Sequence, residues 1–123
     1  MAAKHNFRKL KIWEEGISIV SSTYKFVKNF PEIEKYNLAS QLIRCAVSIP
    51  SNIAEGTSKS TNKHFIKYLN DSLGSAFEWE TQLIVANNEN YIDKEDFIVL
   101  LNKIQQLQRM ISRFQEGLNS KTN

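Results

Sequence analysis

The sequence predicts an all-α protein, folded as an up-down-up-down four-helix bundle. Apolar residues recur at spacings of three and four along most of the chain, which is the period of an amphipathic helix. Only four glycines and two prolines interrupt this pattern in 123 residues. A chain of this length can bury one hydrophobic core. We therefore expect a single domain over residues 1–123, with four helices joined by short loops.

The first two helices are expected over residues 10–29 and 38–55. The apolar face of the first consists of Trp13, Ile17, Val20, Tyr24 and Val27. This helix should end at Phe30, because a residue before proline is pushed out of the helical region and Pro31 follows. The second helix has its apolar face at Leu38, Leu42, Cys45, Ile49 and Ile53. Gly56 is expected to act as its C-terminal stop.

The other two helices are expected over residues 61–88 and 94–118. Ser60 or Thr61 is the predicted N-cap of the third helix. Its core positions are Phe65, Leu69, Ser72, Ala76, Trp79, Leu83 and Ala86. Asp93 is the predicted N-cap of the fourth helix, with Asp96 three residues on. The core positions of this helix are Phe97, Leu100, Ile104, Leu107, Ile111, Phe114 and Leu118.

The stretch SIPSNIAEG, residues 48–56, places a proline inside the second helix. Pro50 lacks an N–H group and its ring presses on the preceding turn, so a bend is expected. The short polar side chains of Ser51 and Asn52 can bond to freed backbone groups. Two interpretations stay open: a bent helix end with local capping, or a bend that forms a recognition surface.

Five segments give the chain a resemblance to a known family. They are FRKLKIW (7–13), FP (30–31), LASQLIR (38–44), SIPSNIAEG (48–56) and GSAFEWE (74–80). Their order and spacing resemble the 23S ribosomal RNA intervening-sequence proteins, a family of four-helix-bundle proteins. The motif positions that we single out are Arg44, Ser48, Pro50, Asn52, Glu55, Gly56, Gly74, Ser75, Glu78 and Glu80.

The resemblance implies a left-handed bundle that assembles into a ring-shaped homopentamer. It implies relatives encoded in intervening sequences of bacterial 23S ribosomal RNA genes, most of them without an assigned biochemical role. The chain is also similar to the accessory variability determinant proteins of diversity-generating retroelements. Those proteins are basic pentamers that associate with a reverse transcriptase and with nucleic acid, so RNA or an RNA–protein complex is an implied partner.

Charge is distributed unevenly along the predicted bundle. The formal net charge is +3. In an up-down bundle, the first helix start, the second loop and the fourth helix end meet at one pole. The cations expected there are Arg8, Lys9, Lys11, Lys59, Lys63, Lys67, Arg109 and Arg113, with Lys4 and Lys121. We interpret this pole as a possible nucleic-acid contact, and the alternative is an ordinary solvated charge pattern.

The third helix also has a second apolar stripe, formed by Ile66, Leu73, Phe77 and Ile84. It is either a broad core contact or a subunit interface. Glu80 lies between the two stripes, which is a poor position for an unpaired carboxylate. We therefore expect Arg44 to pair with Glu80, Glu78 or Glu55, within or between subunits.

Catalysis, metal binding and a cofactor are not indicated. His5 and His64 have no metal-ligand partners at helical spacing, and no phosphate-binding or dinucleotide glycine motif occurs. The lone Cys45 is expected in the core. No stretch is apolar enough to span a membrane and no signal peptide is evident, so we expect a cytoplasmic protein without a small-molecule substrate.

Two functions are therefore considered. One is an RNA-associated accessory ring that binds phosphates through its basic pole. The other is a protein-interaction scaffold without nucleic-acid binding. The sequence places few aromatic residues next to the basic ones, so it offers little support for base stacking.

Overall fold

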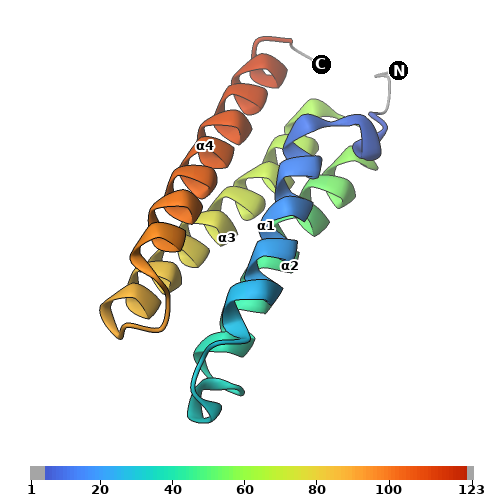
Figure 1. Cartoon of the computed structure of the whole chain (residues 1–123). Coiled ribbons are helices and arrows are strands. Elements are labelled where there is room, and N and C mark those ends of the chain that lie inside the picture. Colours follow the sequence, from blue (N-terminus) through green and yellow to red (C-terminus); the bar gives the residue numbers. More distant parts are fainter. Residues whose placement is uncertain (1–4, 122–123) are drawn as a thin grey trace.

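The structure is a computed structural model, which describes residues 5–121. It contains α1 (Lys11–Val27), α2 (Leu38–Thr57), α3 (Asn62–Asn88), α4 (Lys94–Asn119) and the short 3-10 helices η1 (Phe7–Lys9) and η2 (Glu32–Glu34). Residues 5–121 contain no β-strand. The helices run alternately up and down, each beside its neighbour in sequence (Figure 1). The predicted all-helical, four-helix architecture is confirmed.

The core positions predicted for α2, α3 and α4 are confirmed. Every residue predicted for the α3 core face is buried. In α2 the predicted core residues Leu42, Cys45, Ile49 and Ile53 are buried, and Leu38 packs against the core from its edge. In α4 the buried set is Leu100, Ile104, Leu107, Ile111 and Leu118, while Phe97 and Phe114 are partly buried against it. Cys45 lies in this core, as predicted.

The core face of α1 is shifted by about one residue from the prediction. Trp13, Val20 and Val27 pack partly against the core, as predicted. Ile17 and Tyr24, which were expected in the core, are 40% and 50% exposed. The buried face consists of Ile12, Gly16, Ile19, Thr23 and Phe26. Two members of this face are small or polar, so the apolar spacing alone pointed to the neighbouring stripe.

Contacts with other helices explain why Gly16 and Thr23 lie in the buried face of α1. A Cβ on Gly16 would lie 3.2 Å from Pro50 Cβ and 3.3 Å from Pro50 Cδ, so the glycine lets α1 approach the proline of α2 closely. The Thr23 hydroxyl donates to the Ile19 carbonyl at 2.6 Å and accepts from Trp79 Nε1 at 3.0 Å. A buried indole N–H needs such a partner, so Thr23 is as much a core residue as its apolar neighbours.

Two helix ends differ from the prediction. α1 ends at Val27 instead of residue 29, because the N–H groups of Asn29 and Phe30 bond three residues back, to Phe26 and Val27. α2 continues to Thr57, two residues past its predicted end. Gly56 has no positive φ and is therefore not a left-handed stop. The bounds of α3 and α4 differ from the prediction by one residue each.

Both predicted N-cap positions are confirmed, but only one of the two side chains makes a capping hydrogen bond. Thr61 is the N-cap of α3, and its hydroxyl accepts from the His64 N–H at 3.2 Å. Asp93 occupies the N-cap position of α4, but its side chain makes no capping hydrogen bond. The reciprocal cap with Asp96 is therefore absent. No helix within residues 5–121 is long and apolar enough to cross a membrane.

Candidate nucleic-acid interface

Three separate segments form the pole of the bundle where α1 begins and α4 ends. Asn62, at the start of α3, donates from Nδ2 to the Lys121 carbonyl at 3.1 Å and to the Leu118 carbonyl at 3.4 Å. The His5 ring lies against Phe65 of α3 and Phe114 of α4, with centroids 5.3 Å and 5.8 Å apart. These contacts hold η1, the α2–α3 connection and the α4 end together.

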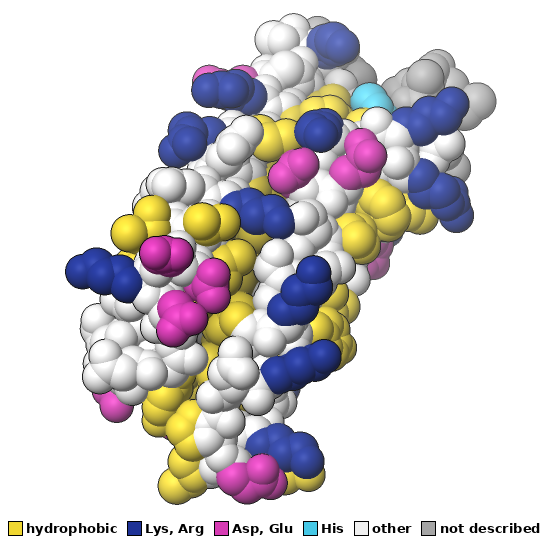
Figure 2. Space-filling view, viewed as in Figure 1, with side chains coloured by type: hydrophobic (Ala, Val, Ile, Leu, Met, Phe, Trp, Pro, Cys, Tyr) yellow, Lys and Arg dark blue, Asp and Glu magenta, His cyan; other side chains and the backbone are white. Residues whose placement is uncertain are grey.

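Most of the predicted cations belong to the helix ends and connections at this pole, whereas Arg109 lies near the middle of α4. The exposed members of this set are Arg8, Lys9, Lys11, Lys63, Lys67, Arg109, Arg113 and Lys121, while Lys59 is half-buried. Lys4 lies outside the described residues. Lys and Arg side chains lie over this end of the molecule, and others continue along the visible face toward the opposite end (Figure 2). We call these cations the basic pole.

Carboxylates dilute the charge of the basic pole. Glu55 and Glu116 lie near the ends of α2 and α4, within the same region. Lys11 Nζ lies 3.5 Å from Glu15 Oε2, which is the only ion pair among the described residues. An exposed pair of this kind contributes about 0.5 kcal/mol or less, so Lys11 can exchange it for another anion. The field at this pole is positive but weaker than the cations alone suggest.

Aromatic rings lie beside two of these cations, which the sequence did not predict. The Arg8 guanidinium carbon lies 4.4 Å from the centroid of the Phe7 ring. Lys59 Nζ lies 4.8 Å from the centroid of the Tyr68 ring. The second pair could not be read from the sequence, because Lys59 precedes α3 and Tyr68 lies in its second turn.

The SIPSNIAEG segment forms the seam between α2 and α3. Ser48 Oγ lies 2.8 Å from Ser75 Oγ across that seam. Ser72 Oγ donates to the Ile49 carbonyl at 2.9 Å, and Asn52 Nδ2 donates to both the carbonyl and the hydroxyl of Ser48 at 3.0 Å. α2 continues through the buried Pro50 without a break. These contacts favour the structural interpretation of the segment, in which short polar side chains allow a close approach of the two helices.

Gly56 completes that seam, and its role differs from the prediction. A Cβ at this position would lie 2.7 Å from Phe65 Cδ1 and 3.0 Å from Tyr68 Cβ. Real Cβ atoms essentially never approach so closely, so the glycine is required by packing and not by backbone conformation. Gly74 is the opposite case, because nothing lies within 4 Å of the point that a Cβ would occupy there.

The expected pairing of Arg44 within one chain is wrong. Arg44 Nη2 donates to Ser40 Oγ at 3.2 Å, and no carboxylate lies within ion-pair distance of it in residues 5–121. Glu80 instead accepts from Gln108 Nε2 at 2.8 Å and from Gln105 Nε2 at 3.1 Å. Two neutral amides from α4 thus satisfy this carboxylate, so a guanidinium is not needed. Glu78 and Glu55 are exposed.

Cys45 lies beside Arg44 and Glu78 but is not an activated nucleophile. Burial raises the pKa of the Cys45 thiol to about 11, and the Glu78 carboxylate adds to the shift. The thiol is therefore protonated at neutral pH, whereas the thiolate is the reactive form.

The second apolar stripe of α3 is divided between core and solvent. Ile66 and Leu73 pack partly against the core, whereas Phe77 is 52% exposed and Ile84 is 39% exposed. Val85 on α3 and Ile98 and Val99 on α4 are also exposed. Phe77 and Ile84 are therefore available to a partner, whereas Ile66 and Leu73 belong to the bundle.

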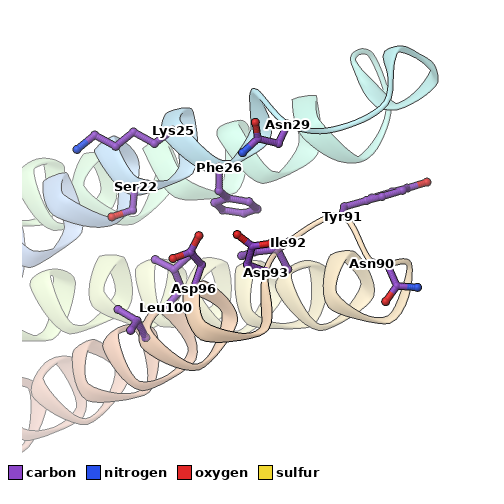
Figure 3. A pocket seen from close by; sticks show the side chains of 11 residues that line it. Ser22, Lys25, Phe26, Asn29, Asn90, Tyr91, Ile92, Asp93, Asp96 and Leu100 are labelled. Atoms are coloured by element: carbon purple, nitrogen blue, oxygen red, sulfur yellow. The ribbon is translucent and has the colours of Figure 1, made fainter.

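A groove lies at the end of the bundle opposite to the basic pole. It has a volume of about 690 Å³ and lies between α1, the start of α4 and the α3–α4 connection. Phe26, Asp93 and Asp96 point into it, whereas Tyr91 points away (Figure 3). Tyr91 Oη donates to Glu34 Oε2 at 3.1 Å. The described residues contain no cluster of His, Cys, Asp and Glu that could hold a metal ion.

Comparisons with known proteins agree with the motifs. A model of the 23S rRNA-intervening sequence protein family matches residues 8–113. The chain is also similar to a crystal structure from Bacteroides thetaiotaomicron, a protein of unknown function from the S23 ribosomal protein family. The two share 23% identity with a TM-score of 0.76, over 85% of this chain and 97% of the other, which supports the fold. No curated protein matches the sequence. With most of its length matched by the family model, this chain belongs to the 23S rRNA-intervening sequence protein family.

Proposed function

We propose that this chain is a non-enzymatic accessory protein that binds RNA through its basic pole as a homo-oligomer. The observation that supports RNA binding best is the convergence of cations from three separate segments on one end of the bundle. Phosphate contacts from such a surface give affinity with little sequence discrimination. A ring of copies with aligned poles would multiply the positive field.

The exposed part of the α3 stripe supports the oligomer. Phe77 is half exposed, with Ile84 two turns further along the same helix. Water-exposed apolar area of this kind is commonly buried in a subunit interface. Gly74 lies three residues before Phe77 and leaves open space on the helix surface. A neighbouring copy could therefore approach the α3 backbone closely there.

Charge reversal tests the RNA contact. We expect the triple variant Lys59→Glu, Lys63→Glu, Lys67→Glu to lose most RNA affinity in fluorescence anisotropy. If each lysine contacts one phosphate, these three contacts make the affinity of the parent fall about 20-fold for a single strand and about 40-fold for a duplex between about 50 and about 200 mM salt. This salt dependence should weaken in the variant. The matched control reverses three lysines elsewhere, Lys25, Lys28 and Lys35. Equal losses in both variants would show only a general effect of net charge.

The interface is tested separately. Phe77→Gln combined with Ile84→Gln should reduce the oligomer to monomers in light scattering without lowering helicity, because both side chains are substantially exposed in one chain. The control is Ile33→Gln, at a side chain that is 76% exposed in the α1–α2 connection. If the double variant keeps its oligomeric mass, the interface lies elsewhere. An oligomer that is indifferent to RNA would favour the protein-interaction scaffold.

A further inference from the structure

We propose that the basic pole selects single-stranded RNA over duplex RNA by stacking bases on Phe7 and Tyr68. In the free protein a cation covers each of these rings. On binding, each cation moves to a phosphate and a base takes its place on the ring. This inference rests on the proposed function, because it assigns the class of RNA that the basic pole binds.

The two rings repeat one arrangement at different places of the pole. Phe7 lies in η1 with the Arg8 guanidinium over its ring, and Tyr68 lies in α3 with Lys59 Nζ over its ring. Both rings are half-buried, so each is anchored on one side and open to solvent on another. In both pairs the cation comes from a short segment outside the four long helices.

The protein holds both rings in place. The Phe7 ring packs against Trp13, with centroids 5.2 Å apart and an interplanar angle of 61°. Asn6 caps η1, since its Oδ1 accepts from the Arg8 N–H at 3.2 Å. The Cβ atom of Tyr68 lies close to the α2 backbone at Gly56, so the root of this side chain is fixed against α2. A base that stacks on either ring would therefore meet a surface that is already ordered.

Exchange of the cation for a base is energetically favourable. An exposed cation–π contact stabilises a pair only about two- to fivefold. Stacking of a base on a protein aromatic ring strengthens binding about five- to 150-fold. The displaced cation then gains a phosphate contact that duplex and single strands both offer. At the middle of these two ranges, each ring should favour an unpaired base by about eightfold.

Only unpaired bases can make this contact. In an RNA duplex each base is stacked within the helix, and the deep major groove keeps side chains away from base edges. Phosphate contacts alone would not favour single strands, because a duplex carries the higher charge density. Selection for single strands therefore requires the two rings.

An RNA duplex of the same sequence serves as the reference for single-strand selection. The experiment itself compares two single-stranded oligonucleotides of equal length, one of normal RNA and one with abasic sites throughout its centre. Both present the same number of phosphates, so anisotropy measures the contribution of the bases directly. We expect the normal strand to bind at least about tenfold more tightly, for two stacked bases. Phe7→Leu and Tyr68→Leu should each reduce the ratio of the two affinities to about its square root, because each variant removes one of two stacked bases. Phe7→Tyr and Tyr68→Phe keep an aromatic ring and should retain it.

A second readout uses the unaltered protein, in case a leucine variant fails to fold. Trp79 is fully buried, so a base bound at the pole should not quench its fluorescence. Quenching of tryptophan fluorescence should therefore report on Trp13, which contacts Phe7. The normal strand should quench this emission and the abasic strand should not. Equal affinity for both strands without quenching would overturn base stacking while leaving phosphate binding intact. If neither strand nor the duplex binds, the proposed function fails, and base stacking fails with it.

Discussion

Gly56→Ala should destabilise the bundle, although alanine is the better helix former. The added Cβ would lie 2.7 Å from Phe65 Cδ1, and the Phe65 ring is 2% exposed. It would also lie 3.0 Å from Tyr68 Cβ, an atom attached directly to the α3 backbone. Neither contact is the flexible end of a side chain. α2 and α3 must therefore separate to accommodate the methyl group.

Two opposing effects determine how much Gly56→Ala changes the free energy of unfolding. Overpacking of a tight interior contact costs about 1–3 kcal/mol. Replacing glycine by alanine inside a helix returns up to about 1 kcal/mol. We expect a net loss of about 1 kcal/mol in the free energy of unfolding, measured by urea titration at one fixed protein concentration. The fixed concentration matters because assembly of copies would add to the apparent stability.

Gly117→Ala is the matched control. Gly117 is also helical, and nothing lies within 4 Å of the position where its Cβ would be added. This variant keeps the gain in helix propensity and lacks the clash, so its stability should equal or exceed that of the parent. If both alanine variants were stabilised equally, close packing would not be the reason for glycine at position 56.

Two further predictions concern buried groups. Thr23→Val should lower the free energy of unfolding by about 1–3 kcal/mol in urea titration, because the Trp79 indole N–H loses its acceptor, whereas Thr23→Ser should retain most of the stability. The Cys45 thiol should react slowly with a disulfide reagent at pH 8, because burial raises its pKa to about 11. In urea it should react at least about 100-fold faster, and equal rates would contradict its burial. Since the neutral thiol is favoured in the folded state, this group stabilises the fold fully below its unfolded pKa, and that contribution is lost as the pH rises through about 11.

Most of the bundle could be predicted because three of its helices bury an apolar stripe with few interruptions, such as Ser72 in α3. α2, α3 and α4 obey the spacing rule that sequence analysis applies. α1 does not, since its buried face includes Gly16 and Thr23. Their reasons for burial lie on other helices, in Pro50 and Trp79, and no local pattern contains that information.

The candidate site shows the same limit. Helix direction places most of the predicted cations toward one end of the bundle, whereas Arg109 lies near the middle of α4. Side-chain partners depend on rotamers and on distant segments. Arg44 was therefore assigned to a carboxylate, whereas it bonds to Ser40, and Glu80 is satisfied by two glutamines. The contact between Lys59 and Tyr68 joins the α2–α3 connection to the second turn of α3, and helix spacing does not relate these two positions.

The central claim is that copies of this chain assemble and bind RNA through the basic pole. Light scattering of the intact protein, at low and at moderate salt, tests it most directly when an RNA with hairpins and single-stranded loops is added. We expect a mass several times that of one chain without RNA, and a heavier complex with RNA that dissociates as salt rises. A monomer, or an oligomer whose mass RNA does not change at low salt, would contradict the claim.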